Sequence, residues 1–297
     1  MRQVKIITDS CADLNAEQLE RYGIAFARMS TSCDGAESVA TLTWTEQEAH
    51  EHYNKMRDGK RIITAQVSVE EFRRIFEEYL QQGMDIVYIG CSSKQSGSVN
   101  TGHLIAQKLM EQYEGSTILC IDSLNASMGE GMLAIEAAKL SSRGASATEI
   151  EAHILSIRKK VNQYVTVHSL DALKRAGRVK GPAAFFGNLM GVKPIIISDV
   201  NGDQAAYKKV KGRQRSFEEI VSLLKASMVA PEEQVVYLTH ADCEKEEIDA
   251  LVALIKREIP CLGVEIGFIG PIVGASIGPD AVGIWGLGQE VTYTIGD

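Results

Sequence analysis

Short apolar runs alternate along the chain with segments of helical periodicity. Runs rich in β-branched residues lack a strict alternation of polar and apolar positions, which is typical of strands buried on both faces: VKIIT, DIVYIG, STILCID, YVTVHSL, KPIIIS and QVVYLT. The segment SVEEFRRIFEEYL instead places its apolar residues on one face of a helix. This alternation predicts an α/β fold with mostly parallel sheet and right-handed crossovers.

Helix starts are marked by a hydroxyl residue followed three positions later by glutamate. In this capping box the two side chains satisfy each other's free backbone amides. The pairs are Ser68 with Glu71, Thr45 with Glu48, Ser146 with Glu149 and Ser216 with Glu219. We therefore expect a helix to begin at each pair.

The pattern changes after about residue 160, where the turn NGD separates two strand-like runs and predicts a hairpin. The chain of 297 residues is long enough for two cores, since single cores stop growing at roughly 250–300 residues. We predict an N-terminal α/β domain over residues 1–162 with mostly parallel sheet. A C-terminal α/β domain over 163–297 would carry a mixed sheet with the hairpin. Clefts between domains are favoured ligand sites, so a ligand cleft between the two is expected.

Composition excludes several classes of protein. The formal net charge is −8, which argues against non-specific binding of nucleic acid, because that requires a basic surface. No apolar stretch approaches the roughly 18 residues of a membrane span, and MRQVKIITDS is typical of a first strand rather than a signal peptide. The six cysteines form no CxxC pair, which favours free thiols in a cytoplasmic protein. His50 and His52 lie in an acidic helix-like stretch, so no metal site is expected.

The stretch GCSSKQSGSVNTG, residues 90–102, places many hydroxyl groups between a predicted strand and a helix. It could be a nucleophile turn, a phosphate cradle or a cup for another anion. No serine in it has glycines at both −2 and +2, so the nucleophile elbow is excluded. His103 and Leu104 stand where a phosphate loop requires lysine and a hydroxyl residue. The remaining interpretation is an anion cup at a helix N-terminus, whose dipole favours negative charge.

Other loops carry polar residues at the ends of predicted strands, where α/β sheets bind ligands. TDSCADL contributes Asp9 and Ser10, and CIDSLNASMGEG contributes Asp122 and Ser123. Thr64 lies between a short predicted strand and the helix that begins at Ser68. Helix capping and ordinary loop structure are the competing interpretations for each of these residues.

Together the loops resemble the DegV family of bacterial lipid-binding proteins. The matching pieces occur in family order from the first strand to the last: IITDSCADL, ITAQVS, GCSSKQSGSVNTG, CIDSLNASMGEG, LDALKRAGRVKG, GVKPIIISDVNG, KKVKGRQRS, LTHAD and IGPIVGASIGPDAVG. The resemblance implies two α/β domains that hold a long-chain fatty acid between them, with no catalysis by the chain itself and no cofactor. It also implies an ATP-binding fatty acid kinase partner that phosphorylates the bound carboxylate for phospholipid synthesis.

The resemblance also implies functional residues. The family's carboxylate ligands fall on Thr64 and Ser96, and its third headgroup ligand, usually histidine, falls on Ser276. The polar rim expected from the loops at the strand ends comprises Asp9, Ser10, Ser93, Gly97, Asp122 and Ser123. Basic positions linked to the kinase contact fall on Arg213 and Arg178. Val67 and Ala176 stand where the family commonly has proline and glycine.

The tail of a fatty acid needs apolar lining. Candidate lining residues, for which ordinary core packing is the alternative, are Phe185, Phe186, Leu189, Met190, Ile195 and Ile196.

A serine hydrolase acting on acyl esters is the alternative function. Ser96 would be its nucleophile, with His103 or His240 as the base. His103 lies about two helical turns from Ser96, which argues against that pairing. His240 ends a predicted strand and could face the same edge of the sheet.

Overall fold

The computed structural model describes residues 2–182, 185 and 191–295. The chain divides into two compact units, and each is discontinuous in sequence. Unit 1 comprises Met1–Trp44, Ile62–Arg158 and Gly270–Ile272; unit 2 comprises Thr45–Arg61, Lys159–Ile269 and Val273–Asp297. The domain boundary at residue 162 stays a prediction about the folding units.

Unit 1 is built around a parallel sheet with the strand order β2-β1-β6-β7. Its strands are β1 (Val4–Asp9), β2 (Ala25–Ala27), β6 (Asp85–Gly90) and β7 (Ile118–Asp122). Every pairing in this sheet is parallel. The mostly parallel sheet predicted for the N-terminal half is therefore confirmed. The carboxyl ends of β1, β6 and β7 carry the loops that sequence analysis singled out.

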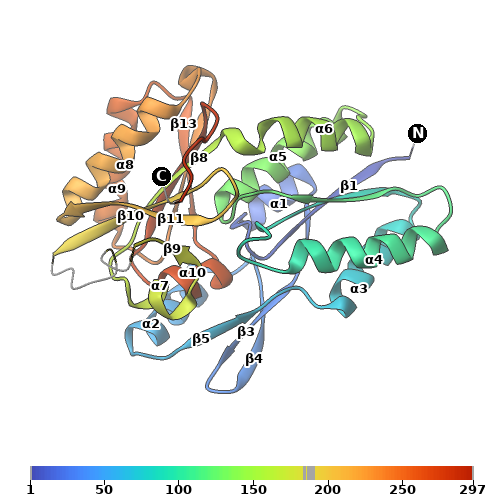
Figure 1. The fold of residues 1–297 in the computed structure, drawn as a ribbon, viewed down its shortest axis with the longest axis horizontal. Helices are drawn as coiled ribbons and strands as arrows, with labels where there is room; N and C mark the ends of the chain where they lie inside the picture. Colours follow the sequence, from blue (N-terminus) through green and yellow to red (C-terminus); the bar gives the residue numbers. More distant parts are fainter. Residues whose placement is uncertain (1, 183–184, 186–190, 296–297) are drawn as a thin grey trace. The chain divides into compact units, whose positions relative to one another are not determined.

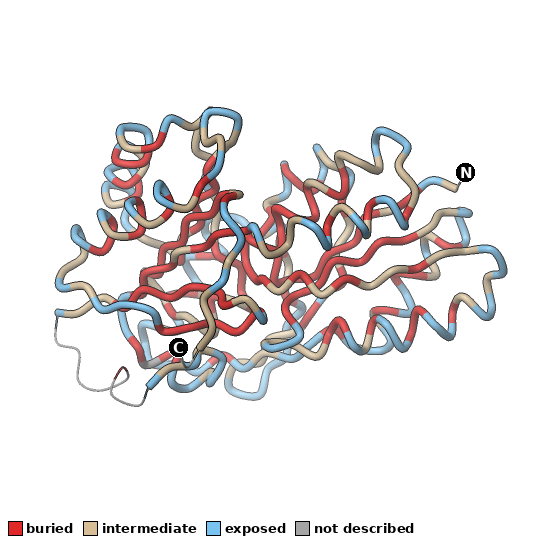
Figure 2. The backbone as a smooth tube through the Cα atoms, turned by 45° about the horizontal axis from the view of Figure 1, so that its top comes forward, coloured by how far each residue is buried: buried red, intermediate tan, exposed pale blue. Residues whose placement is uncertain are grey.

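Helices cover both faces of the parallel sheet, which explains why its strands read as continuous apolar runs. These helices are α1 (Ala16–Tyr22), α3 (Val69–Leu80), α4 (Ser98–Gln112), α5 (Met128–Ser142) and α6 (Ala147–Ile157). In Figure 1, α3 and α4 run along one side of the sheet and α5 and α6 along the other. Figure 2 shows the strands between them as a largely buried band.

A small antiparallel sheet, which the sequence did not predict as a sheet, completes unit 1. Its strand order is β4-β3-β5, with β3 (Met29–Cys33), β4 (Ala36–Ala40) and β5 (Ile62–Ala65). These strands are short and partly polar, so they lack the apolar signal of the parallel sheet. Thr31 of β3 lies opposite Ser38 of β4 and Thr64 of β5.

The predicted helix caps give a mixed outcome. Reciprocal capping boxes form at Thr45 and Ser146, while Ser68 accepts from the Glu71 amide at 3.1 Å without a reciprocal bond. The prediction at Ser216 is wrong. Helix α8 (Arg213–Ser227) begins earlier, and Ser216 Oγ donates to the Arg213 carbonyl at 2.6 Å inside its first turn. The Ser216 hydroxyl therefore makes a hydrogen bond to the backbone three residues earlier instead of capping the helix.

Unit 2 contains a mixed sheet with the order β13-β12-β14-β8-β10-β11-β9. Its strands are β8 (Val161–Thr166), β9 (Val179–Lys180), β10 (Val192–Ser198), β11 (Gln204–Lys211), β12 (Val235–His240), β13 (Gly263–Phe268) and β14 (Val282–Leu287). Antiparallel β10 and β11 form the hairpin that the NGD turn predicts. The predicted fold class, with its mixed C-terminal sheet, is confirmed.

Further helical elements of unit 2 are α2 (Glu46–Arg57), α7 (Asp171–Ala176), α9 (Lys245–Glu258) and the 3-10 turn Pro231–Glu233. Helix α10 (Pro271–Ile277) and the 3-10 turn Arg158–Lys160 each include residues of both units. Helices α8 and α9 share a core with the sheet, and that core includes Ile195. Among the candidate tail residues, Phe185, Ile195 and Ile196 are buried; Phe186, Leu189 and Met190 lie outside the described residues. No helix in the described part of the chain is long and apolar enough to cross a membrane.

Candidate functional site

The loop between β6 and α4 folds into a tight turn around Ser92. The amides of Gln95 and Ser96 both donate to the Ser92 carbonyl, at 2.9 and 3.0 Å. This turn brings Ser96 to the start of α4, where its side chain is half-buried. The opening stretch therefore presents one hydroxyl directly at a helix N-terminus.

Ser96 caps α4 although Gly97, the N-cap residue, has no side chain to do so. Ser96 Oγ accepts from the Ser98 amide at 3.2 Å and lies 2.9 Å from Ser98 Oγ. Ser98 Oγ in turn accepts from the Val67 amide at 3.2 Å. With the Ser98 hydroxyl donating to Ser96 Oγ, the Ser96 proton is free to point outward. The relay from Val67 through Ser98 to Ser96 would then strengthen that outward donor, because hydrogen bonds in a chain polarise one another.

The loop after Thr64 packs directly on this turn. Gln66 Nε2 donates to Thr101 Oγ1 at 2.9 Å, next to the Ser98–Val67 bond. A Cβ on Gly97 would lie 2.1 Å from Gln66 Oε1, so only glycine allows this approach. The two predicted carboxylate-ligand loops are thus joined to each other within unit 1.

Thr64 belongs to a row of hydroxyl residues that sequence analysis missed. Thr31 pairs with both Thr64 and Ser38, so the three residues lie side by side on one face of the small sheet. Val39 and Ile63, which are exposed, lie at alternate positions on the opposite face. The three central residues of MSTSC all carry hydroxyl groups, so no alternation of apolar and polar positions marked the strand.

Asp9 lies beneath the turn and is fully buried. Its carboxylate accepts from the amides of Cys11 at 2.9 Å and Cys91 at 3.2 Å, and from the Tyr88 hydroxyl at 2.7 Å. Burial raises the pKa of Asp9, while these hydrogen bonds oppose the rise. Asp9 therefore fixes the start of the loop from below and is not exposed to a ligand.

Two further buried acids accompany Asp9. Asp13 accepts from the Gly270 amide at 2.8 Å and from Ser127 Oγ, and burial raises its pKa to about 7. Glu130 accepts from Thr8 Oγ1 at 2.7 Å, and burial followed by the nearby Asp9 charge raises its pKa well above the ordinary value. These side chains hold the loops at the carboxyl edge of the parallel sheet together.

The other predicted rim residues divide into two groups. Ser10 and Ser123 are fully buried and bond to backbone groups, Ser10 Oγ donating to the Ala40 carbonyl at 2.8 Å. Ser93 and Asp122 remain accessible, with the Ser93 amide donating to Asp122 Oδ1 at 3.3 Å. The accessible part of the rim therefore adjoins Ser96, while the buried part supports it.

The candidates in unit 2 are described separately. Ser276 is half-buried in α10, and Arg178 is exposed. Arg213 is largely buried; it pairs with Glu247 at 2.9 Å and lies over the Phe217 ring at 4.5 Å. The roles assigned to these residues stay predictions.

Within the described residues of unit 1, the Ser96 hydroxyl is hydrogen-bonded to Ser98 and not to a histidine. His103 is exposed on α4 with Gln107 3.2 Å away. His240 is buried in unit 2 and accepts from the Cys243 amide at 3.2 Å, and burial lowers its pKa to about 4. No group of acidic, histidine or cysteine side chains that could hold a metal occurs among the described residues. The arrangement is suited to binding an anion.

Comparison with known proteins extends the resemblance. The sequence matches the family model described as "Uncharacterised protein, DegV family" over residues 3–287. It is 32% identical to the DegV domain-containing protein CPE0026 of Clostridium perfringens, covering 97% of this chain and 99% of that one.

Solved structures share the fold. A DegV family protein from Thermus thermophilus, described by its fatty acid binding, is 25% identical with a TM-score of 0.85, covering 97% of this chain and all of that one. A stearic-acid-binding protein from Eubacterium ventriosum is 23% identical with a TM-score of 0.83, over 96% of this chain and 97% of that one. With a family model matched along almost its whole length and a relative of this similarity, the chain belongs to the DegV family.

Proposed function

We propose that the protein binds a long-chain fatty acid and holds its carboxylate with the hydroxyls of Thr64 and Ser96. The observation that carries this proposal is the relay at the start of α4, where Ser98 can leave the Ser96 proton free to donate. A fatty acid is the ligand because the Thermus thermophilus relative at 25% identity is described as a fatty acid binder.

The chemistry of the site suits a carboxylate. A carboxylate that leaves water needs hydrogen bonds, or its burial is prohibitive. Hydrogen bonds to a charged group contribute about 1.5–3 kcal/mol each, and the α4 dipole adds to them. The half-buried Thr64 and Ser96 hydroxyls can donate such bonds, whereas the acids beneath them are already committed to backbone and hydroxyl donors.

The tail supplies the larger share of affinity. Burying roughly 14 methylenes at about 0.8 kcal/mol each contributes on the order of 11 kcal/mol before association costs. Chain length should therefore set affinity, while the hydroxyls set orientation. This division of roles is typical of a carrier that must release an intact acid.

The test of binding is native mass spectrometry of the purified protein, followed by extraction and identification of the bound molecule. We expect an added mass that matches a fatty acid of long chain. A protein that is empty and also fails to take up palmitate or oleate from solution would contradict the proposal.

We further propose that the bound carboxylate is presented to an ATP-dependent fatty acid kinase subunit, with the chain itself performing no catalysis. Arg178 is exposed and suited to a partner contact, whereas the ion pair with Glu247 would have to open before Arg213 could serve. Mixing the loaded protein with such a subunit and ATP should yield acyl phosphate, trapped as hydroxamate. Arg178→Ala should slow this reaction without weakening fatty acid binding.

The serine hydrolase alternative has a direct test. A fluorophosphonate probe labels serines activated by a base. Because Ser98 is the neighbour of Ser96 in place of a histidine, we expect no labelling at Ser96. Stoichiometric labelling that Ser96→Ala abolishes would reverse this assignment.

A further inference from the structure

The first strand of unit 1 extends beyond its neighbour on one side. Strand β2 pairs only with Ile7–Asp9 of β1, whereas β6 pairs with β1 from Val4 onward. Residues Val4–Ile6 therefore have a partner strand on the β6 side and, within the described chain, none on the β2 side. Such an unpaired stretch can accept another strand.

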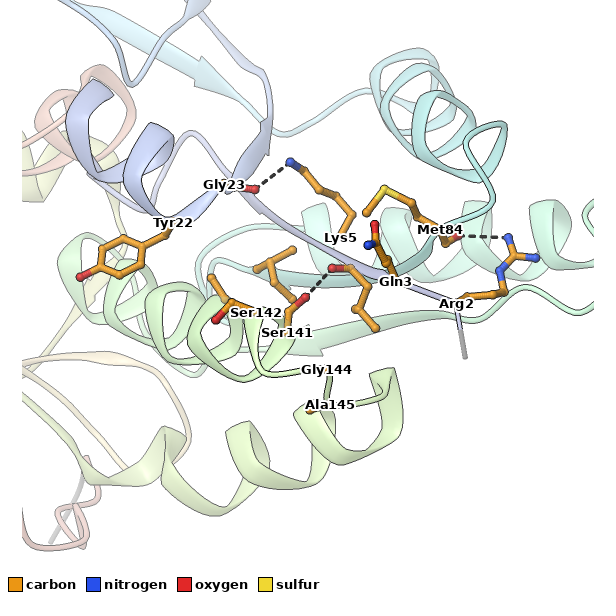
Figure 3. Close-up of a pocket in the computed structure, with 13 residues that line it drawn as sticks. Arg2, Gln3, Lys5, Tyr22, Gly23, Met84, Ser141, Ser142, Gly144 and Ala145 are labelled. Atoms are coloured by element: carbon orange, nitrogen blue, oxygen red, sulfur yellow. Dashed lines mark hydrogen bonds between the residues drawn. The ribbon is translucent and has the colours of Figure 1, made fainter.

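A groove of about 480 Å³ runs along this unpaired stretch (Figure 3). Its walls come from β1, from Tyr22 and Gly23 at the end of α1, and from the last turn of α5 at Ser141 and Ser142. The volume falls within the range of about 300–1,000 Å³ found for ligand pockets. The groove lies at the amino end of β1, whereas the candidate carboxylate site lies at the carboxyl edge of the sheet.

Backbone groups of β1 face into the groove. The Gln3 carbonyl accepts from the Asp85 amide at 2.7 Å and so faces β6. The Val4 carbonyl instead accepts from Ser141 Oγ at 2.6 Å and so faces α5 (Figure 3). Because successive residues of a strand direct their backbone groups to opposite sides, the amides of Val4 and Ile6 also face the groove. Ser141 occupies one acceptor with a hydroxyl that can rotate away.

The lining of the groove carries positive charge. Arg2 and Lys5 are the charged side chains among its described lining residues. Lys5 Nζ donates one hydrogen to the Gly23 carbonyl at 2.7 Å and lies 4.8 Å from the centre of the Tyr79 ring. Two of its three hydrogens remain for an incoming acceptor. Asp85 lies 3.1 Å from Arg2, and Glu78 interacts electrostatically with Lys5, so both cations are partly offset, while the described lining of the groove itself includes no acidic residue.

We propose that this groove is a docking site for an extended peptide segment with acidic side chains, which adds as a strand beside Val4–Ile6. Main-chain hydrogen bonds to β1 would supply affinity, as in other cases of strand addition. The positive charges of Lys5 and Arg2 would select acidic over basic segments.

The probe is a fluorescein-labelled heptapeptide of alternating glutamate and valine, acetylated and amidated at its ends. We expect saturable binding, with loss of hydrogen exchange at the Val4 and Ile6 amides. The same peptide N-methylated at every residue has no N–H to donate to the Val4 carbonyl, and its methyl groups block the close approach of the two strands, so it should bind at least tenfold more weakly. A lysine–valine peptide should lose affinity to the same degree.

Variants locate the site. Ser142 is exposed at the groove, and its Oγ donates to the Lys139 carbonyl at 2.8 Å; Ser156 is exposed on α6, and its Oγ donates to the His153 carbonyl at 2.7 Å. Ser142→Trp should fill the groove and reduce peptide binding at least tenfold, while the matched Ser156→Trp should not. Lys5→Gln should weaken binding of the glutamate peptide and strengthen binding of the lysine peptide. Thermal melts verify that each variant is folded.

Three results would overturn the proposal. They are failure of the glutamate peptide to bind, equal binding of its N-methylated form, and binding that Ser142→Trp leaves intact. Palmitate titration of the same variants keeps the two proposals separate, because the groove variants should retain fatty acid binding.

Discussion

At the scale of single residues, the site depends on which hydroxyl groups already donate their proton to another group of the protein. Ser10 and Ser123 give their protons to backbone carbonyls, while the relay through Ser98 can leave the Ser96 proton available. Sequence spacing identified the loop as rich in donors but could not distinguish these cases. Burial and hydrogen-bond direction, which depend on tertiary contacts, decide which serine can meet an anion.

Removing one hydroxyl of the relay should weaken carboxylate binding. Ser96→Ala should reduce palmitate affinity roughly 10- to 150-fold, which corresponds to the loss of about 1.5–3 kcal/mol. Isothermal titration measures this change. Ser68→Ala is the matched control, because it removes the α3 cap and lowers stability by about 1 kcal/mol without touching the relay. Equal affinity losses in both variants would indicate a structural role for Ser96.

The hydroxyl row on the small sheet can be dissected in the same way. Thr64→Val keeps the shape of the side chain and removes its hydroxyl, so palmitate affinity should fall at least tenfold with little change in melting temperature. Thr31→Val, at the position of β3 opposite Thr64, should cause a smaller loss of palmitate affinity, because Thr31 is not one of the two proposed carboxylate ligands. Affinity that survives Thr64→Val would remove this residue from the carboxylate site.

Asp13 should make stability depend on pH. Its pKa is raised from 3.8 to about 7, so the folded protein binds more protons than the unfolded chain between these values. The contribution of Asp13 to the free energy of unfolding should therefore fall by up to about 4 kcal/mol as pH rises from about 4 to 7. Above pH 7 this contribution should level off.

The variant Asp13→Asn isolates this contribution, because an amide does not titrate. Urea unfolding of both proteins from pH 4 to 8 should give a native-minus-variant difference in the free energy of unfolding that falls as pH rises to about 7. The difference cancels the opposite slope expected from His52 and His240, whose pKa values are lowered to about 4. Identical slopes would contradict the assignment.

At the scale of elements, the sequence predicted the long apolar strands and three of the four helix starts that capping pairs marked. DIVYIG corresponds to β6 residue for residue, because a strand buried on both faces must be apolar throughout. The small sheet was missed because its strands are short and polar on one face. The wrong helix start at Ser216 has a related cause: a capping box and an i−3 hydrogen bond use the same residue types, and only the backbone separates them.

The contact between the two ligand loops can be tested at this scale. Gly97→Ala should push Gln66 out of its bond to Thr101 and weaken palmitate binding. Gln66→Ala alone also removes the bond to Thr101, so it should lose as much affinity as Gly97→Ala, and the double variant should lose no more than either. A clearly larger loss in Gly97→Ala than in Gln66→Ala would place the cause in the α4 backbone.

At the scale of the whole molecule, family membership was predictable because the motifs run along nearly the entire chain. The division of the chain into two discontinuous units was not predictable. Residues Thr45–Arg61 group with the C-terminal half and Gly270–Ile272 with the N-terminal half, and no composition change marks either exchange. A boundary inferred from a change of pattern assumes continuous domains, whereas the two compact units are each discontinuous in sequence.

The ligand preference of the whole molecule should follow chain length. Each additional methylene buried contributes about 0.8 kcal/mol, or roughly a fourfold gain in affinity. Titration with saturated acids of 10 to 18 carbons, below their solubility limits, should give this slope until the tail site is filled. Affinity independent of chain length would show that the tail is not buried.

The hydrogen bond from Gly270 to Asp13 also has a consequence for synthesis on the ribosome. Asp13 emerges among the first residues, but its partner emerges only when most of the chain has been translated. Until then the loop between β1 and α1 lacks one of the two donors that satisfy its buried carboxyl group. The nascent N-terminal unit should therefore remain incompletely ordered and open to chaperones until translation is nearly complete.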